Sequence, residues 1–150
     1  MRLLIQRVAR ASVRVEDQVV GAIGQGLLLL VGVEQDDNEG DATWLAEKVS
    51  KLRIFSDEDG KMNASVLDVQ GELLVVSQFT LHASYKKGTR PSFVKAAHPD
   101  HAIPMYEAFV GACETAMDKP VSTGQFGASM AVELINDGPV TIWMDTQNKE

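Results

Sequence analysis

Two short polar segments interrupt the apolar strand patterns of this chain, and both could carry chemistry. The first is Ser77-Gln78-Phe79-Thr80, which ends the long apolar run that begins at Leu73. Hydroxyl and amide groups at the end of an apolar strand offer hydrogen bonds without any charge that titrates. A structural strand end, in which Ser and Thr bond to the backbone, is the alternative interpretation of the same pattern.

The second segment is Asn-Asp-Gly-Pro-Val-Thr at residues 136–141, between two strand-like stretches. Proline cannot donate to a strand ladder, so it does not belong in the middle of a strand. Gly138-Pro139 therefore predicts a turn, a bulge or a cis peptide bond, and a cis bond would turn the local carbonyl groups in an unusual direction. An ordinary tight turn of a hairpin is the alternative.

The charge distribution adds a third feature. The chain has a net charge of −7, so it cannot coat nucleic acid by bulk electrostatics, and any RNA contact needs a local basic patch. The 27 residues from Leu73 to Pro99 contain no Asp or Glu, although the chain has 21 acidic residues. Four cations in this window could form such a patch for RNA phosphates, or they could form a solvated basic loop: Lys86, Lys87, Arg90 and Lys95.

Several common catalytic signatures are missing from the sequence. There is no Gly-x-Gly-x-x-Gly, P-loop, His-Glu-x-x-His or Gly-x-Ser-x-Gly motif. The single cysteine, Cys113, excludes an internal disulfide. His82, His98 and His101 lie in or beside one loop, and a metal-dependent hydrolase that uses them stays open as a less favoured alternative.

Length and composition indicate a single ordinary domain over residues 1–150, with a polar tail from about 145 to 150. No apolar run reaches the roughly 18 residues that a membrane span needs, and no signal-peptide core is visible at the start. We therefore expect a cytoplasmic protein without a membrane partner.

Hydrophobic periodicity predicts about eight strands and two helices. The helices are expected from Asp41, as N-cap, to Leu52 and from Pro99 to about Met117, and a long loop is expected over 82–98. The strands are expected at 3–8 and 13–16 with a break at 9–12, and at 19–23, 27–33, 53–55, 66–69, 72–81, 130–135 and 140–144. Because the strands come in hairpin-like runs, we predict an α+β fold of the α/β class, with a mixed, largely antiparallel, curled and barrel-like sheet over two main helices.

Both polar segments resemble the signature motifs of the D-aminoacyl-tRNA deacylase family. They occur in the family's order, about 60 residues apart. The resemblance covers residues 1–144, and further stretches that carry it are Gln6-Arg7-Val8, Ala11-Ser12-Val13, Arg53-Ile54-Phe55, Gly60-Lys61-Met62-Asn63, Arg90-Pro91-Ser92-Phe93 and Thr123-Gly124-Gln125-Phe126-Gly127-Ala128.

The resemblance implies a homodimer with its active site at the subunit interface. Ser77, Gln78, Phe79 and Thr80 would line the catalytic pocket. A cis Gly138-Pro139 unit, with Asn136 beside it and Arg7 bracing it, would enter the partner's pocket and bind substrate there. Phe126 and Met130 would receive the terminal adenosine of an aminoacylated tRNA. The family implies no metal or organic cofactor, and DNA is not an expected partner.

The implied reaction is hydrolysis of the ester bond of D-aminoacyl-tRNA, with glycyl-tRNA mischarged on tRNA-Ala as a further substrate and L-aminoacyl groups rejected. Three roles for the first motif stay open, in this order. Backbone N–H groups near Phe79 and Thr80 could stabilise the oxyanion with help from the substrate's 2′-hydroxyl. Thr80 could orient water or substrate. Thr80 could instead form an acyl intermediate, although no base stands in the motif to activate it. A non-catalytic module that binds an RNA end or a small ligand is the rival from another class.

Overall fold

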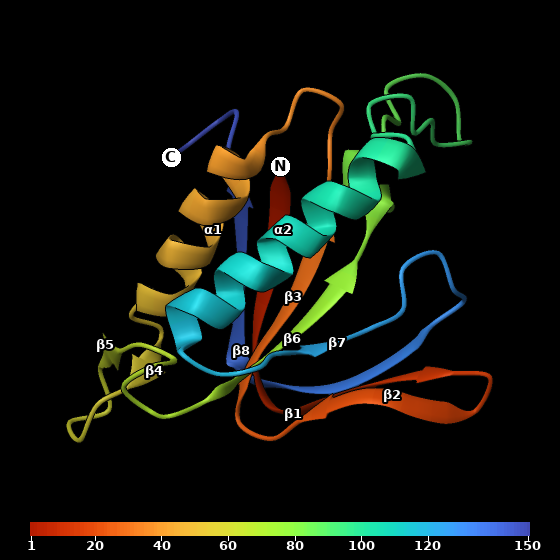
Figure 1. The fold of residues 1–150 in the computed structure, drawn as a ribbon. Helices are drawn as coiled ribbons and strands as arrows, with labels where there is room; N and C mark the ends of the chain where they lie inside the picture. The colour runs from red at the N-terminus through yellow and green to blue at the C-terminus, as the bar shows by residue number, and fades with distance from the viewer.

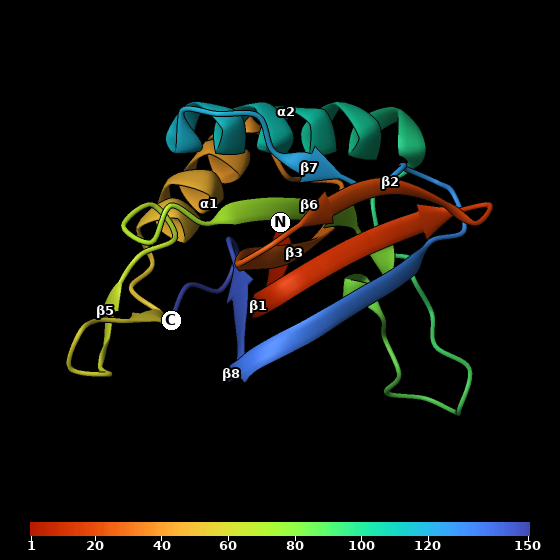
Figure 2. The same cartoon turned by 90° about the horizontal axis from the view of Figure 1, so that it is seen from below.

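The computed structural model describes all of residues 1–150, as one curled sheet with two helices packed against one face (Figure 1). Figure 2 shows the helices as a layer above the strands. The elements in chain order are β1 (Arg2–Val15), β2 (Gln18–Ile23), β3 (Gly26–Gly32), α1 (Glu39–Lys51), β4 (Phe55–Ser56), β5 (Met62–Ala64), β6 (Glu72–Ser77), the 3₁₀ helix η1 (Phe79–His82), α2 (Pro99–Met117), β7 (Ser122–Thr123) and β8 (Ala131–Asp145).

The long strand β1 organises the sheet. Its first half pairs antiparallel with β3, its second half pairs antiparallel with β2, and β8 pairs antiparallel along its other edge. The pairs β3–β6 and β6–β7 are parallel. The predicted mixed, largely antiparallel sheet with two helices is therefore confirmed. No helix is long and apolar enough to cross a membrane.

The main core lies between the helices and the sheet. It is a cluster of 22 buried residues, in which Leu45 and Val49 of α1 and Phe109 of α2 meet apolar side chains of β1, β3 and β6. A smaller cluster of seven buried residues, including Val13 and Leu74, fills the concave side where the sheet curls. The curl matters for function because it leaves the end of β6 open beside the start of α2.

Several expected boundaries were wrong. β1 runs through 9–12 without a break, because these residues pair with β8. The stretch 66–69 is a turn and not a strand, and the strand lies at Met62–Ala64 instead. β6 ends at Ser77, not at Leu81, and gives way to η1. Asn38 and not Asp41 caps α1, β4 is Phe55–Ser56, and β7 was missed. The two strands expected at 130–135 and 140–144 are one strand, β8, which continues through 136–139 with a shift in register.

The C-terminal tail is anchored at its start. Asp145 belongs to β8 and accepts a hydrogen bond from Arg2 Nε at 2.9 Å. Thr146 is buried, and its Oγ1 accepts from the Met1 ammonium, which also pairs with buried Asp37. The tail that was expected from about residue 145 is therefore part of the fold as far as Thr146.

Candidate active site

A mostly apolar cavity of about 620 Å³ opens where β6 ends, between η1, the start of α2 and the segment 124–130. Of its 18 lining residues, 13 are hydrophobic. Ser77, Gln78 and Phe79 of the first motif line it, together with Phe126 and Met130. Five residues that the sequence singled out therefore line the same cavity. They come from two segments that are about 50 residues apart in the chain.

The turn after β6 leaves two backbone donors free. Gln78 N–H still continues the sheet by donating to Val31 O at 2.7 Å, and Leu81 N–H closes the turn on Gln78 O at 3.3 Å. Between them, the N–H groups of Phe79 and Thr80 have no acceptor in the chain. The first N–H groups of a helix lack intrahelical partners for geometric reasons. Two adjacent donors are therefore available to a ligand oxygen where β6 gives way to η1, and one of the two residues, Phe79, lines the cavity.

The Thr80 side chain has no partner that could activate it as a nucleophile. It is exposed and does not line the cavity. Its Oγ1 accepts a hydrogen bond from Gln78 Nε2 at 2.5 Å, and no histidine or lysine bonds to it. A threonine needs such a base to act as a nucleophile. The structure therefore offers the Thr80 backbone, more than its hydroxyl, to the chemistry.

Aromatic rings form the walls of the cavity. Phe79 and Phe93 meet edge to face with 5.1 Å between ring centroids, and Phe126 packs on Tyr106 at 5.7 Å. The Tyr106 hydroxyl donates to Val75 O at 2.9 Å. Burial, with a smaller contribution from Cys113, raises the pKa of Tyr106 to about 12, so this hydroxyl stays protonated. These aromatic side chains can hold a flat or apolar group, but they supply no acid or base.

The three histidines do not form a cluster. His82 is buried and neither ring nitrogen has a hydrogen-bond partner, whereas His98 lines the cavity and His101 Nε2 lies 3.0 Å from Asp37 O. No group of three or more His, Cys, Asp or Glu residues is arranged to hold a metal ion. The residues present therefore do not fit the alternative in which His82, His98 and His101 bind a catalytic metal.

His82 should make the stability of the fold depend on pH. Burial lowers the pKa of His82, so the folded chain keeps it neutral where the unfolded chain, with a pKa of about 6.5, takes up a proton. The free energy of unfolding should fall as pH drops below about 6.5, by at most about 1.4 kcal/mol per pH unit from this group. Urea unfolding of wild type and His82→Leu from pH 7.5 to 5 measures this. Equal slopes for the two proteins would contradict the assignment.

The second motif forms a braced loop in the middle of β8. The Gly138–Pro139 peptide bond is cis, and the register between β1 and β8 shifts there. Arg7 is buried and its Nε donates to Asp137 O at 3.0 Å. Asn136 Nδ2 donates to Arg7 O at 3.0 Å and to Val140 O at 2.9 Å. Arg7 and Asn136 therefore hold the loop, while Pro139 at its tip is exposed.

This loop does not reach the cavity of its own chain. Ser77 is in register with Val31, Leu3 and Met144 on the successive strands β3, β1 and β8. Measured along the sheet, Gly138-Pro139 therefore lies three strands away from Ser77, roughly 14 Å at about 4.8 Å per strand, and several residues further along. Neither residue lines the cavity. The structure leaves the exposed loop free for a contact outside its own subunit.

The four predicted tRNA contacts all project from the loop beside the cavity. Lys86, Lys87, Arg90 and Lys95 are exposed, and none forms an ion pair within the chain. A bridge between Ser84 and Ser92 closes the part of the loop that carries Lys86, Lys87 and Arg90, and Lys95 follows this closed part. Its cations are therefore available to solvent or to an anionic ligand.

Comparison with known proteins decides the family. The family model described as D-Tyr-tRNA(Tyr) deacylase matches residues 4–145. The chain belongs to this family. Among curated deacylases, it is 59% identical to the D-aminoacyl-tRNA deacylase of Flavobacterium johnsoniae and 56% identical to that of Bacteroides thetaiotaomicron, over the full length of both chains in each case.

Two solved structures have folds similar to that of this deacylase. A chain described as c-Myc DNA unwinding element binding protein superposes with a TM-score of 0.91 at 38% identity, and it covers 97% of this chain and 99% of its own. A probable eukaryotic D-amino acid tRNA deacylase gives a TM-score of 0.82 at 17% identity, with 95% and 97% covered. At that identity the second likeness shows the fold alone.

The cavity also contains residues that sequence reasoning did not select. Ala102 and Tyr106 line it. Phe93 and His98 line it as well, although the sequence named Phe93 only in a stretch that carries the resemblance and His98 only as a possible metal ligand. Tyr106 lies in the helix that was expected from Pro99 to about Met117, and the sequence assigned it no role at the site. Its hydroxyl on an otherwise apolar stripe was the available signal, because a buried phenol needs a hydrogen-bond partner.

Proposed function

We propose that this deacylase hydrolyses the ester that joins a D-amino acid to the terminal ribose of tRNA, and releases the free D-amino acid and the tRNA. The observation that carries this proposal is the pair of unbonded N–H groups, of Phe79 and Thr80, beside an apolar cavity. Ester hydrolysis develops negative charge on the carbonyl oxygen, and fixed backbone donors stabilise that charge without reorganising.

The proposed reaction needs no side-chain nucleophile. Water attacks the carbonyl carbon, and the oxygen that becomes negative is held by the two N–H groups. The intermediate then collapses, the bond from carbonyl carbon to ribose oxygen breaks, and the ribose oxygen takes up a proton. That proton comes from the attacking water, and in this proposal the neighbouring 2′-hydroxyl of the substrate relays it. Loss of one such backbone donor typically costs about 3–4 kcal/mol of transition-state stabilisation.

The second part of the proposal concerns chirality. In a homodimer, the exposed Gly138-Pro139 loop of one subunit enters the cavity of the other, and its carbonyl oxygens hold the α-ammonium group of the substrate. An L side chain would collide with this loop, whereas a D side chain or the hydrogen of glycine has room. Specificity by collision with the wrong substrate is a common solution when attractive contacts cannot discriminate. The position of the loop, exposed and away from its own cavity, supports this arrangement.

The third part concerns the RNA. The terminal adenosine of tRNA, and of glycyl-tRNA-Ala in the same way, stacks on Phe126 beside Met130, and base–aromatic stacking contributes about 1–3 kcal/mol. Lys86, Lys87, Arg90 and Lys95 contact a few phosphates of the acceptor end, which positions the substrate without reading its sequence. Such a substrate places the enzyme in the cytoplasm, where aminoacyl-tRNA is made and used.

The proposed activity is tested with D-tyrosyl-tRNA and L-tyrosyl-tRNA, each incubated with the protein and a metal chelator. We expect rapid loss of the D-ester only. Stable D-ester in the presence of tight RNA binding would favour the non-catalytic module, and activity that the chelator abolishes would favour the metal-dependent hydrolase. Equal cleavage of both esters would refute the chiral filter.

Thr80→Ala should keep most of the activity. The substitution removes a hydroxyl that lies outside the cavity and accepts only from Gln78 Nε2, but it preserves the backbone N–H. We expect kcat on D-tyrosyl-tRNA to fall by less than about tenfold, the range of a lost neutral hydrogen bond of about 1 kcal/mol. A folded but inactive variant, together with a covalent adduct at Thr80 in wild type, would restore the acyl-enzyme mechanism.

A further inference from the structure

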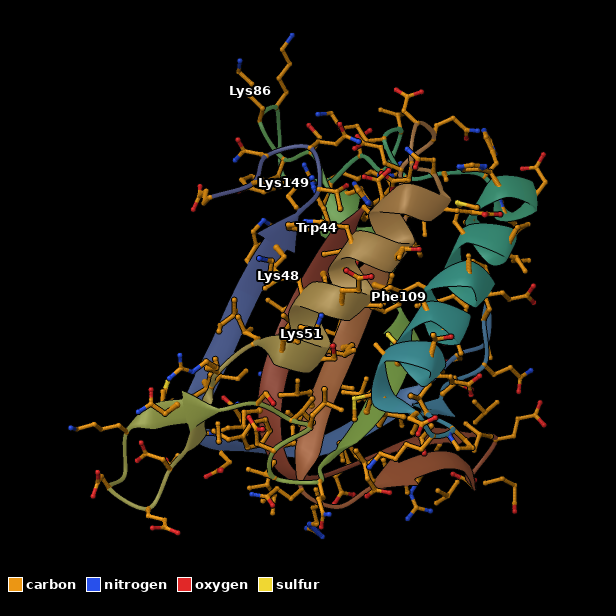
Figure 3. The ribbon with its side chains drawn as sticks, turned by 60° about the vertical axis from the view of Figure 1, so that its left-hand side comes forward. Trp44, Lys48, Lys51, Lys86, Phe109 and Lys149 are labelled. Atoms are coloured by element: carbon orange, nitrogen blue, oxygen red, sulfur yellow. The ribbon has the colours of Figure 1, made fainter.

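A second cationic surface lies on α1, outside the cavity. Trp44, Glu47, Lys48 and Lys51 stand on one side of the helix, at the spacing of successive turns. With Leu52 and Arg53 they line a shallow hollow of about 430 Å³. Figure 3 looks onto this face, where Trp44, Lys48 and Lys51 follow one another along α1 and Lys149 lies beside them.

Trp44 joins the helix to the C-terminal tail. The ammonium of Lys149 lies 4.3 Å from the centroid of the Trp44 ring, and that of Lys48 lies 5.6 Å from it. A cation over an aromatic face is attracted by the ring, by about 0.5–1 kcal/mol at an exposed site. Two lysines from distant parts of the chain, Lys48 and Lys149, therefore lie against the Trp44 ring.

The lysines on this face are not neutralised by the chain itself, whereas the charge of Arg53 interacts with the Asp68 carboxylate. Lys48, Lys51 and Lys149 are exposed and take part in no ion pair. Arg53 donates to Asn63, a neutral partner, and Glu47 is the one acidic residue in the lining of the hollow. The helix dipole favours Lys48 and Lys51 in the last turn of α1. It does not account for Lys149, which comes from the tail.

We propose that this α1 surface, defined by Lys48, Lys51, Arg53 and Lys149, binds the ribose–phosphate backbone of tRNA away from the aminoacyl end. The inference rests on the proposed function, which supplies the RNA. Lysine ammonium groups bind phosphates as point charges. Lys149 and Lys48 already lie against the Trp44 ring, so a nucleobase cannot stack on it. The surface therefore presents positive charge to the phosphates of the RNA backbone. It shares no residue with the cavity, so the two contacts are separate.

The test compares Lys48→Ala/Lys51→Ala with Lys48→Arg/Lys51→Arg, which keeps both charges at the same positions. Binding of uncharged tRNA is measured between 50 and 200 mM salt. The alanine variant should bind about tenfold more weakly at low salt, and its slope of log K against log salt should decrease by about 2, since each phosphate contact contributes about 0.9. The arginine variant should bind like wild type.

Hydrolysis provides the second readout. For D-tyrosyl-tRNA, the alanine variant should show a higher KM with unchanged kcat, whereas for D-tyrosyl-adenosine, which lacks the rest of the RNA, both constants should match wild type. Unchanged tRNA binding, an equal defect in the arginine variant, or a higher KM for the short substrate would each overturn the inference. If wild type cleaves neither D-ester, the proposed function fails, while the tRNA binding measurement still decides the α1 surface.

Discussion

Replacing Phe79 with proline should lower kcat for D-tyrosyl-tRNA by about 100- to 1000-fold, the loss typical for one oxyanion donor. Proline has no backbone N–H, so the substitution removes one of the two unbonded donors at the cavity. Position 79 is the first residue of η1, where proline is tolerated because that N–H has no intrahelical partner. Phe79 is 57% exposed, and we therefore expect the fold to survive.

Phe79→Ala is the matched control, because it removes the same ring but keeps the N–H group. We expect it to retain kcat within about tenfold, with any defect in KM, since its edge contact with Phe93 shapes only the cavity wall. Thermal unfolding of both variants shows whether either is misfolded. Equal kcat for the proline and alanine variants would show that the Phe79 N–H does not stabilise the transition state.

Gly138→Ala should lower kcat/KM for D-tyrosyl-tRNA by at least about 100-fold, the cost of misplacing a positioning group by about 1 Å. Gly138 has φ of +127°, a conformation that residues with a side chain rarely adopt. A methyl group there would lie 2.8 Å from Val140 Cγ2 and 2.9 Å from the Arg7 guanidinium. Because Arg7 also braces Asp137, the collision displaces the whole loop.

Gly88→Ala separates this effect from simple backbone strain. Gly88 also has positive φ, +69°, but an added methyl group would meet nothing within 4 Å. We expect normal activity and selectivity from it. If Gly138→Ala folds and still cleaves the D-ester at the wild-type rate without attacking the L-ester, the loop does not enclose the substrate.

The first motif could be predicted from the sequence because its residue types change locally. The residues that surround it in the cavity could not, because chain topology brings them there. The change from apolar to polar residues at Ser77 marked the strand end. The arrival of Phe93 and Tyr106 at the same cavity depends on how the loop and α2 cross the end of the sheet. That crossing is a tertiary property, and periodicity within one segment does not report it.

The boundary errors have equally local causes. The stretch 66–69 has strand-like residues, but the carboxylate of Asp68 accepts from both the backbone and the hydroxyl of Ser65, which stabilises a turn. A break was expected at 9–12, yet β1 continues through this stretch, where residues 10–12 pair with the long strand β8. On the α1 surface, the contact of Lys149 with Trp44 joins residues about 100 positions apart, and no sequence pattern predicted it.

We propose that each active site combines the cavity of one subunit with the loop of the other. Mixing two variants tests this proposal most directly. Phe79→Pro impairs the cavity and Gly138→Ala impairs the loop, so each homodimer should be nearly inactive. In a mixed dimer, the sound cavity of one subunit would receive the sound loop of the other. Unfolding and refolding an equal mixture should give half mixed dimers with one working site each, and therefore roughly a quarter of wild-type activity on D-tyrosyl-tRNA. Activity no higher than that of the separate variants would show that cavity and loop do not meet across a dimer.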